Sequence, residues 1–112
     1  MEHHTPLPRL RMTLLDERYY DEAPRRPAVC RLWRMRPASP AVGGVRYAIG
    51  MESLTRRYLY CVGEDESAAR LLFERITEGR LSPVHLGDVV EDFLWETERE
   101  RGEAAEAEQS CV

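Results

Sequence analysis

The spacing of the apolar residues changes once along this chain, near Asp65, and that change limits the folds available to it. Upstream of Asp65, short segments alternate apolar and polar residues, as half-buried strands do. Downstream, apolar residues recur at helical spacing, namely Ala69, Leu72, Phe73 and Ile76. The sequence therefore predicts an α+β fold, in which an antiparallel meander of three or four strands is followed by two helices packed on one face of the sheet.

Four segments have the alternation expected of strands: residues 9–15, 28–36, 45–52 and 57–62. In the first of them, Leu10, Met12 and Leu14 share one face. In the second, the alternation breaks between Leu32 and Trp33, which favours a bulge or two partly covered faces. The short connection between the last two segments predicts a hairpin.

Capping residues indicate where the two helices begin and end. Asp65 is a good N-cap for the first helix, and Gly79 is expected to end it in the left-handed conformation. Ser82 and Pro83 are expected to open the second helix, because the serine side chain can accept a hydrogen bond from a free amide and proline lacks the amide. The inward stripe of this helix comprises Leu86, Val89, Val90, Phe93, Leu94 and Thr97.

A length of 112 residues fits one small domain. We expect that domain to span residues 9–97, with a flexible segment at 1–8 and a charged, frayed tail at 98–112. The chain has no run of about 18 apolar residues, so we expect no membrane interaction. The N-terminal residues include no apolar stretch of the signal-peptide type, which predicts a cytoplasmic protein.

Motifs for covalent catalysis or cofactor binding are missing from the sequence. Cys30, Cys61 and Cys111 form no C-x-x-C pair, so neither a disulfide framework nor a cysteine zinc site is indicated, and we expect Cys61 to be buried and inert. The sequence contains no G-x-S-x-G, no G-x-x-x-x-G-K-[ST] and no G-x-G-x-x-G. We therefore expect no catalytic residue, no cofactor and no enzymatic activity.

Charge is unevenly distributed along the chain, and all 16 basic residues are arginine. Residues 1–62 hold 11 Arg and 6 acidic residues, whereas residues 63–112 hold 5 Arg and 14 acidic residues. Such asymmetry can mark a surface for a partner. It is equally consistent with a basic sheet that is neutralised by its own acidic helices.

One aromatic residue lies on the polar side of the second predicted helix, over residues 83–96. The helical period places Trp95 opposite the inward stripe, among Asp88, Glu91 and Asp92. An aromatic side chain on an acidic face is typical of a protein-binding hot spot. The preferred hypothesis is therefore a non-enzymatic interaction or regulatory module that uses these four residues to bind a protein partner or a second copy. The alternative is that Trp95 packs against the tail or a loop of the sheet.

A second constellation on this helix combines a histidine with two carboxylates. His85, Asp88 and Asp92 follow the spacing i, i+3 and i+7, so they fall within one narrow stripe. Such a set could ligate a metal ion or share a proton in a metal-assisted enzyme. The simpler interpretation is that acids early in a helix stabilise its N-terminal end.

Arginines interleaved with aromatic residues indicate a further alternative, single-stranded RNA binding by the sheet. The residues concerned are Arg31, Trp33, Arg34, Arg36, Arg46, Tyr47, Arg56, Arg57, Tyr58 and Tyr60. Against this hypothesis, Tyr47 shares a face with Val45 and Ile49, which predicts a core position. The calculated pI of 5.4 is also lower than nucleic-acid-binding domains usually have.

Three stretches together resemble a family of small clostridial (Firmicutes) proteins classed as a domain of unknown function. They are RYAIGMES, RRYLYCVGEDESAARLLFERI and LSPVHLGDVVEDFL, within residues 45–95, and the resemblance is strongest over Ser82–Leu94. It implies a small cytoplasmic bacterial α+β domain. It supplies no activity, ligand or catalytic residue.

Overall fold

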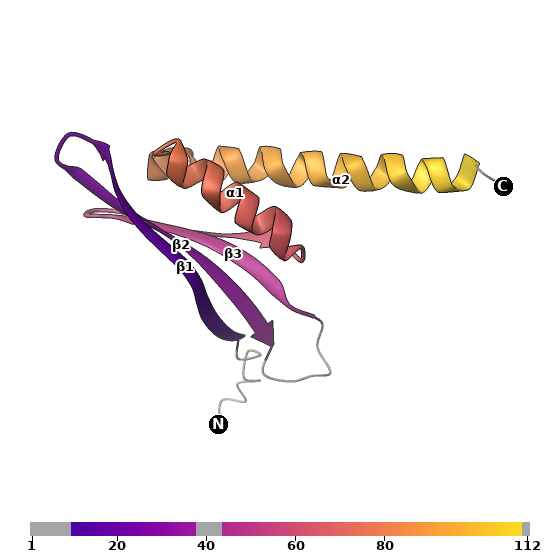
Figure 1. The fold of residues 1–112 in the computed structure, drawn as a ribbon, viewed down its shortest axis with the longest axis horizontal. Coiled ribbons are helices and arrows are strands. Elements are labelled where there is room, and N and C mark those ends of the chain that lie inside the picture. Colours follow the sequence, from indigo (N-terminus) through magenta and orange to yellow (C-terminus); the bar gives the residue numbers. More distant parts are fainter. Residues whose placement is uncertain (1–9, 38–43, 111–112) are drawn as a thin grey trace, which may run out of the picture.

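The computed structural model describes residues 10–37 and 44–110, with side chains for 11–37 and 44–99. Its elements, in chain order, are β1 (Leu10–Ala23), β2 (Arg26–Pro37), β3 (Arg46–Ser53), β4 (Arg57–Gly63), α1 (Glu66–Glu78), a short 3₁₀ turn η1 (Pro83–His85) and α2 (Leu86–Ser110). A four-stranded antiparallel sheet is thus followed by two helices (Figure 1), which confirms the predicted α+β class. The segment at 1–8 that was expected to be flexible lies outside the described residues.

The sheet is a simple meander with strand order β1-β2-β3-β4. Its central register aligns Leu32 with Ile49, and Ile49 with Tyr60. The predicted hairpin between β3 and β4 is closed by a hydrogen bond of 2.9 Å from the Ser53 amide to the Arg56 carbonyl oxygen. Because every pair of neighbouring strands is joined in sequence order, the two outer edges belong to β1 and β4.

Strand β1 continues eight residues beyond the predicted end at Leu15. Leu14 pairs with Trp33 and Asp16 with Leu32, so Leu15 is the extra residue of a bulge. The break in the β2 pattern therefore marks the position of a bulge, but the additional residue belongs to β1. A bulge exchanges the two faces of a strand. Leu14 consequently lies on the face away from the helices and is 43% exposed.

The two helices cover one face of the sheet and leave the other uncovered (Figure 1). Helix α1 packs over β2 and β3, and α2 packs over β4. The core between the layers includes Phe73 (1% exposed) and Leu86 (0%), both from the predicted helical stripes. Burial of each such side chain contributes about 1.5–3 kcal/mol, so these stripes are the main reason the helices dock.

The end of α1 differs from the prediction in one residue. Asp65 caps the start as expected, since its Oδ1 accepts a hydrogen bond of 3.1 Å from the Ala68 amide. At the other end, Gly79 keeps a right-handed conformation (φ −78°), and Arg80 takes the left-handed one (φ 49°). The Leu81 amide then bonds the Ile76 carbonyl oxygen at 3.1 Å, closing a Schellman motif around Arg80.

The second helical segment begins and ends differently from the prediction. The Ser82 side chain makes no capping hydrogen bond; instead its carbonyl oxygen accepts from the His85 amide at 3.0 Å, within η1. Helix α2 then continues to Ser110, whereas the sequence suggested a frayed tail from residue 98. Residues 98–110 are rich in Ala, Glu and Arg, which have high helix propensity, so the helix can continue without an apolar anchor.

Candidate partner-binding surfaces

Trp95 lies on the outer face of α2, as the helical period predicts. Its side chain is 62% exposed, and the Arg99 guanidinium carbon stands 5.6 Å from the centre of the indole ring. Opposite it on the same helix, Val90 is 2% exposed and packs into the core. The indole therefore presents most of its apolar area to solvent, with a cation–π contact on one side.

The acidic residues predicted to accompany Trp95 also face solvent. Asp88, Glu91 and Asp92 are all exposed, as is His85. His85 belongs to η1 rather than to α2, so the three metal-ligand candidates do not share one regular helix. Among the described residues, no group of three or more His, Cys, Asp or Glu side chains is arranged to hold a metal ion. His85, Asp88 and Asp92 are therefore not brought together as a metal site, and the geometry does not support the metal hypothesis.

The C-terminal part of α2 extends past both the sheet and α1 (Figure 1). We call residues 96–110 the distal segment. It holds six glutamates and two arginines, a net charge of −4, and its last turn has no basic residue. A helix C-terminus already bears a partial negative charge, so this distribution is unfavourable for an isolated helix. A cationic surface placed against the distal segment would relieve that repulsion.

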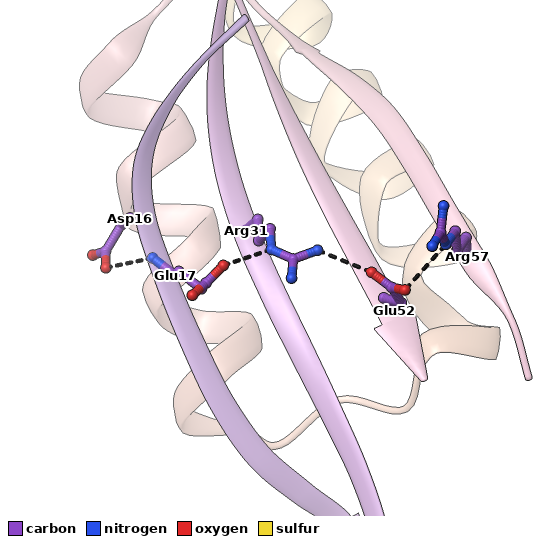
Figure 2. Close-up of polar contacts among 5 residues, drawn as sticks. All are labelled: Asp16, Glu17, Arg31, Glu52 and Arg57. Atoms are coloured by element: carbon purple, nitrogen blue, oxygen red, sulfur yellow. Dashed lines mark hydrogen bonds and ion pairs between the residues drawn. The ribbon is translucent and has the colours of Figure 1, made fainter. Parts of the chain in front are cut away.

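A row of alternating charges crosses the uncovered face of the sheet, with one residue from each strand (Figure 2). The Arg31 Nε atom lies 2.6 Å from Glu17 Oε2, and its Nη1 atom 2.9 Å from Glu52 Oε2. Arg57 adds a contact of 3.0 Å to the other oxygen of Glu52. The Arg31 hydrogen bonds lower the pKa of both carboxyls and raise that of the guanidinium. All four charges are satisfied within the sheet, so this row is structural.

Apolar side chains flank the charged row on the same face. Met12 and Leu59 are 42% and 55% exposed, and a shallow groove of about 330 Å³ separates them, floored by Gly50 and lined by Trp33. A Cβ atom at Gly50 would stand 3.3 Å from Leu59 Cδ1 and 3.6 Å from Trp33 Nε1, so the glycine keeps this groove open. Sequence reasoning missed this face because it assigned the apolar side of residues 9–15 to the core.

Three arginines gather on the other face of the sheet, at the end formed by the start of β1 and the end of β2. We call Arg11, Arg34 and Arg36 the arginine cluster. Arg11 lies directly opposite Arg36, and Arg34 pairs with Tyr47 on the next strand. No ion pair or side-chain hydrogen bond connects the cluster to any described residue. Like charges facing each other across strands are destabilising, so an anion placed here would be stabilising.

The aromatic residues proposed for RNA stacking mostly lie under the helices. Tyr47 is 8% exposed, and Tyr58 and Tyr60 pack against the core with their rings stacked 6.5 Å apart. Of the aromatic residues in that hypothesis, Trp33 is the one on the uncovered face. Arg31 and Arg57 are engaged by glutamates. The aromatic residues of that hypothesis therefore do not form the row of free rings that base stacking uses.

The two described cysteines are unlike one another. Cys30 is buried (0% exposed), and burial raises the pKa of its thiol to about 12. Cys61 is exposed on β4, so the prediction that it is buried was wrong. It belongs to an edge strand and points to the face that no helix covers. Cys111 lies outside the described residues.

Comparisons of the chain with protein-family models, curated proteins and solved structures found no match. The resemblance to a clostridial family over residues 45–95 stays a prediction. Within the described residues, no helix has the length and apolar character needed to cross a membrane.

Proposed function

We propose that this chain is a non-enzymatic protein-interaction or regulatory module of the cytoplasm, and that it binds its partner through the outer face of α2. The observation behind this proposal is the position of Trp95, which is 62% exposed on a helix face that also presents Asp88, Glu91 and Asp92. Tryptophan is enriched among the residues that dominate protein interfaces, because covering its large ring removes much apolar area from water.

The neighbouring charges support a partner with a basic surface. Asp88, Glu91 and Asp92 flank the indole and are exposed. Rim charges of this kind steer association and restrict the choice of partner more than they add affinity. Trp95 would therefore supply binding energy, and the acids would favour a cationic surface around the pocket that receives it.

RNA binding is the second candidate, and the arginine cluster is the observation that favours it. Arg11 and Arg36 are exposed and have no carboxylate partner among the described residues. The burial of Tyr47 and the packing of Tyr58 and Tyr60 against the core oppose it. The net charge of −4 would also repel a polyanion at long range.

The test compares Trp95→Ala with Leu71→Ala in a pull-down from bacterial lysate at low salt, with protein and nucleic acid both identified in the eluate. Leu71 is a matched control, because it is 52% exposed on α1 and away from the acidic face. Circular dichroism and thermal unfolding should show both variants folded. We expect Trp95→Ala to weaken binding of the recovered protein by about 2 kcal/mol, roughly thirtyfold, and Leu71→Ala to leave it unchanged. Equal recovery by both variants, or unfolding of Trp95→Ala, would contradict the proposal.

A further inference from the structure

Among the described side chains, no ion pair joins the basic sheet to the acidic helices. The described sheet arginines form ion pairs only with carboxylates of the sheet itself, namely Asp16, Glu17 and Glu52. The one ion pair within α1 joins Arg70 to Glu66. The sequence had left open that the helices neutralise the sheet, yet no direct contact of that kind forms between described side chains. The arginine cluster therefore stays available to another molecule.

Both surfaces are electrostatically unfavourable when they are alone. In the arginine cluster, Arg11 and Arg36 oppose each other across β1 and β2. In the distal segment, glutamates accumulate toward the negative end of a long helix, and its last turn has no basic residue. Contact between the two surfaces would relieve both repulsions at once. We therefore expect it to contribute more binding free energy than a single surface ion pair usually does.

The geometry prevents this contact within one copy. Helix α2 is continuous from Leu86 to Ser110, and its first turns are fixed on β4 by Leu86 and Val90. At 1.5 Å per residue, the distal segment extends about 22 Å along the same axis. Figure 1 shows it leading away from the sheet, whereas the strand ends that bear the arginine cluster lie beyond α1 in a different direction. A second molecule is needed to bring them together.

We propose that this second molecule is another copy of the same chain, and that the distal segment of each copy lies on the arginine cluster of the other. Such an exchange is two-fold symmetric and closed, because each copy donates one helix and receives one. The inference rests on the proposed function, since it names the partner of α2. It assigns to the acidic distal segment of α2 a basic surface on the sheet of the second copy.

Charge exchange between two variants tests this directly. A sheet variant, Arg11→Glu with Arg36→Glu, makes the cluster acidic. A helix variant, Glu100→Arg with Glu103→Arg and Glu106→Arg, makes the distal segment basic. Arg11 and Arg36 are exposed, so folding should be unaffected, and circular dichroism verifies it. The control is Arg25→Glu with Arg26→Glu, which makes the same change in net charge at the opposite end of β1 and β2.

The readout is sedimentation velocity over a range of protein concentrations, in about 0.01 M and about 1 M salt, where the screening length falls from roughly 30 Å to 3 Å. We expect wild type to dimerise at low salt. The dissociation constant of the dimer should be at least about tenfold larger at high salt. Each variant alone should be monomeric, because it opposes like charges. An equimolar mixture of the two variants should dimerise again, and the control should behave as wild type does.

Failure of self-association can be distinguished from failure of the proposed function. A wild type that is monomeric at low salt, or a mixture that fails to associate although wild type does, would overturn self-association. If self-association failed but the pull-down still recovered a protein partner that depends on Trp95, the proposed function would stand without self-association. Binding of a single-stranded RNA oligonucleotide that is abolished in the sheet variant, with no dimer, would assign the arginine cluster to nucleic acid. A dimer that obeys the charge exchange but is unaffected by Trp95→Ala would support self-association and show that Trp95 lies outside the dimer contact.

Discussion

The phenol ring of Tyr60 occupies the space where a side chain at Gly87 would lie. A Cβ atom built at Gly87 would stand 2.9 Å from Tyr60 Oη and 3.3 Å from Cζ. Since Tyr60 belongs to β4 and Gly87 to the first turn of α2, this glycine sets how closely the helix approaches the edge strand. The second turn can then bury Val90 against the core.

Gly87→Ala should destabilise the protein by about 1 kcal/mol. Overpacking costs about 1–3 kcal/mol, and the better helix propensity of alanine returns about 1 kcal/mol. Urea unfolding measures the difference. Tyr60→Phe removes the hydroxyl that stands at 2.9 Å. In the Tyr60→Phe background, Gly87→Ala should lower the free energy of unfolding by less, or raise it. An equal loss of stability in both backgrounds would show that the ring does not limit the approach of α2.

Removal of the Arg31 guanidinium should destabilise the protein in a pH-dependent way. Its hydrogen bonds lower the pKa of Glu17 and Glu52 from the ordinary value of 4.5. A lowered pKa in the folded state means that stability is present above pH 4.5 and is lost as the pH falls through the folded pKa. Arg31→Met should therefore differ most from wild type near pH 7, and the difference should shrink below pH 4.5.

Arg57→Met is the control for that experiment, because Arg57 is 83% exposed and contacts Glu52 alone. An exposed ion pair of this kind contributes little, so the control should follow wild type at every pH. Parallel stability–pH curves for Arg31→Met and wild type would contradict a structural role for the charged row.

Arg80→Gly should stabilise the protein by about 0.5–1 kcal/mol, because glycine takes the left-handed conformation without the penalty of a Cβ atom. Arg80 has a φ of 49° in the turn after α1. Arg80→Ala removes the same charge and keeps the Cβ atom, so it should bring no gain. Thermal unfolding at one pH compares the two. A similar melting temperature for both variants would argue against backbone strain at this position.

Thiol labelling should distinguish the two described cysteines. In a Cys111→Ser background at pH 8, we expect rapid modification of Cys61 and none of Cys30 in the folded protein. The Cys30 thiol is buried and its pKa is raised to about 12, so little thiolate forms and the reagent cannot reach it. Urea should expose Cys30 to the reagent. Labelling of Cys30 at the rate of Cys61 without urea would contradict the described core.

Local periodicity was enough to predict most of the fold. The alternation of residues 45–52 and the helical stripe from Ala69 to Ile76 both reflect one-sided burial, which a sequence records directly. The second half of β1 could not be predicted in this way. Its polar residues are held by distant partners: Arg18 donates to the Thr77 hydroxyl at 3.3 Å, and Tyr20 donates to the Leu81 carbonyl oxygen at 2.7 Å.

Among the candidate surfaces too, the sequence predicts what depends on a single element and not what depends on strand register. The exposure of Trp95 follows from the period of a single helix, so the sequence predicts it. The charged row does not follow, because Glu17, Arg31 and Glu52 come together only through the register of three strands. A period of two indicates which residues share a face within a strand, but it does not show which residue of the next strand lies alongside.

The separation between the distal segment and the arginine cluster affects how the molecule orients in the electric field of a charged surface. Opposite charges held apart on a rigid frame form a permanent electric dipole, whatever the net charge of −4. Such a molecule turns as it approaches a charged surface, so that its attractive end arrives first. It would present its sheet to an anionic support and α2 to a cationic one, with the orientation set before any contact is made.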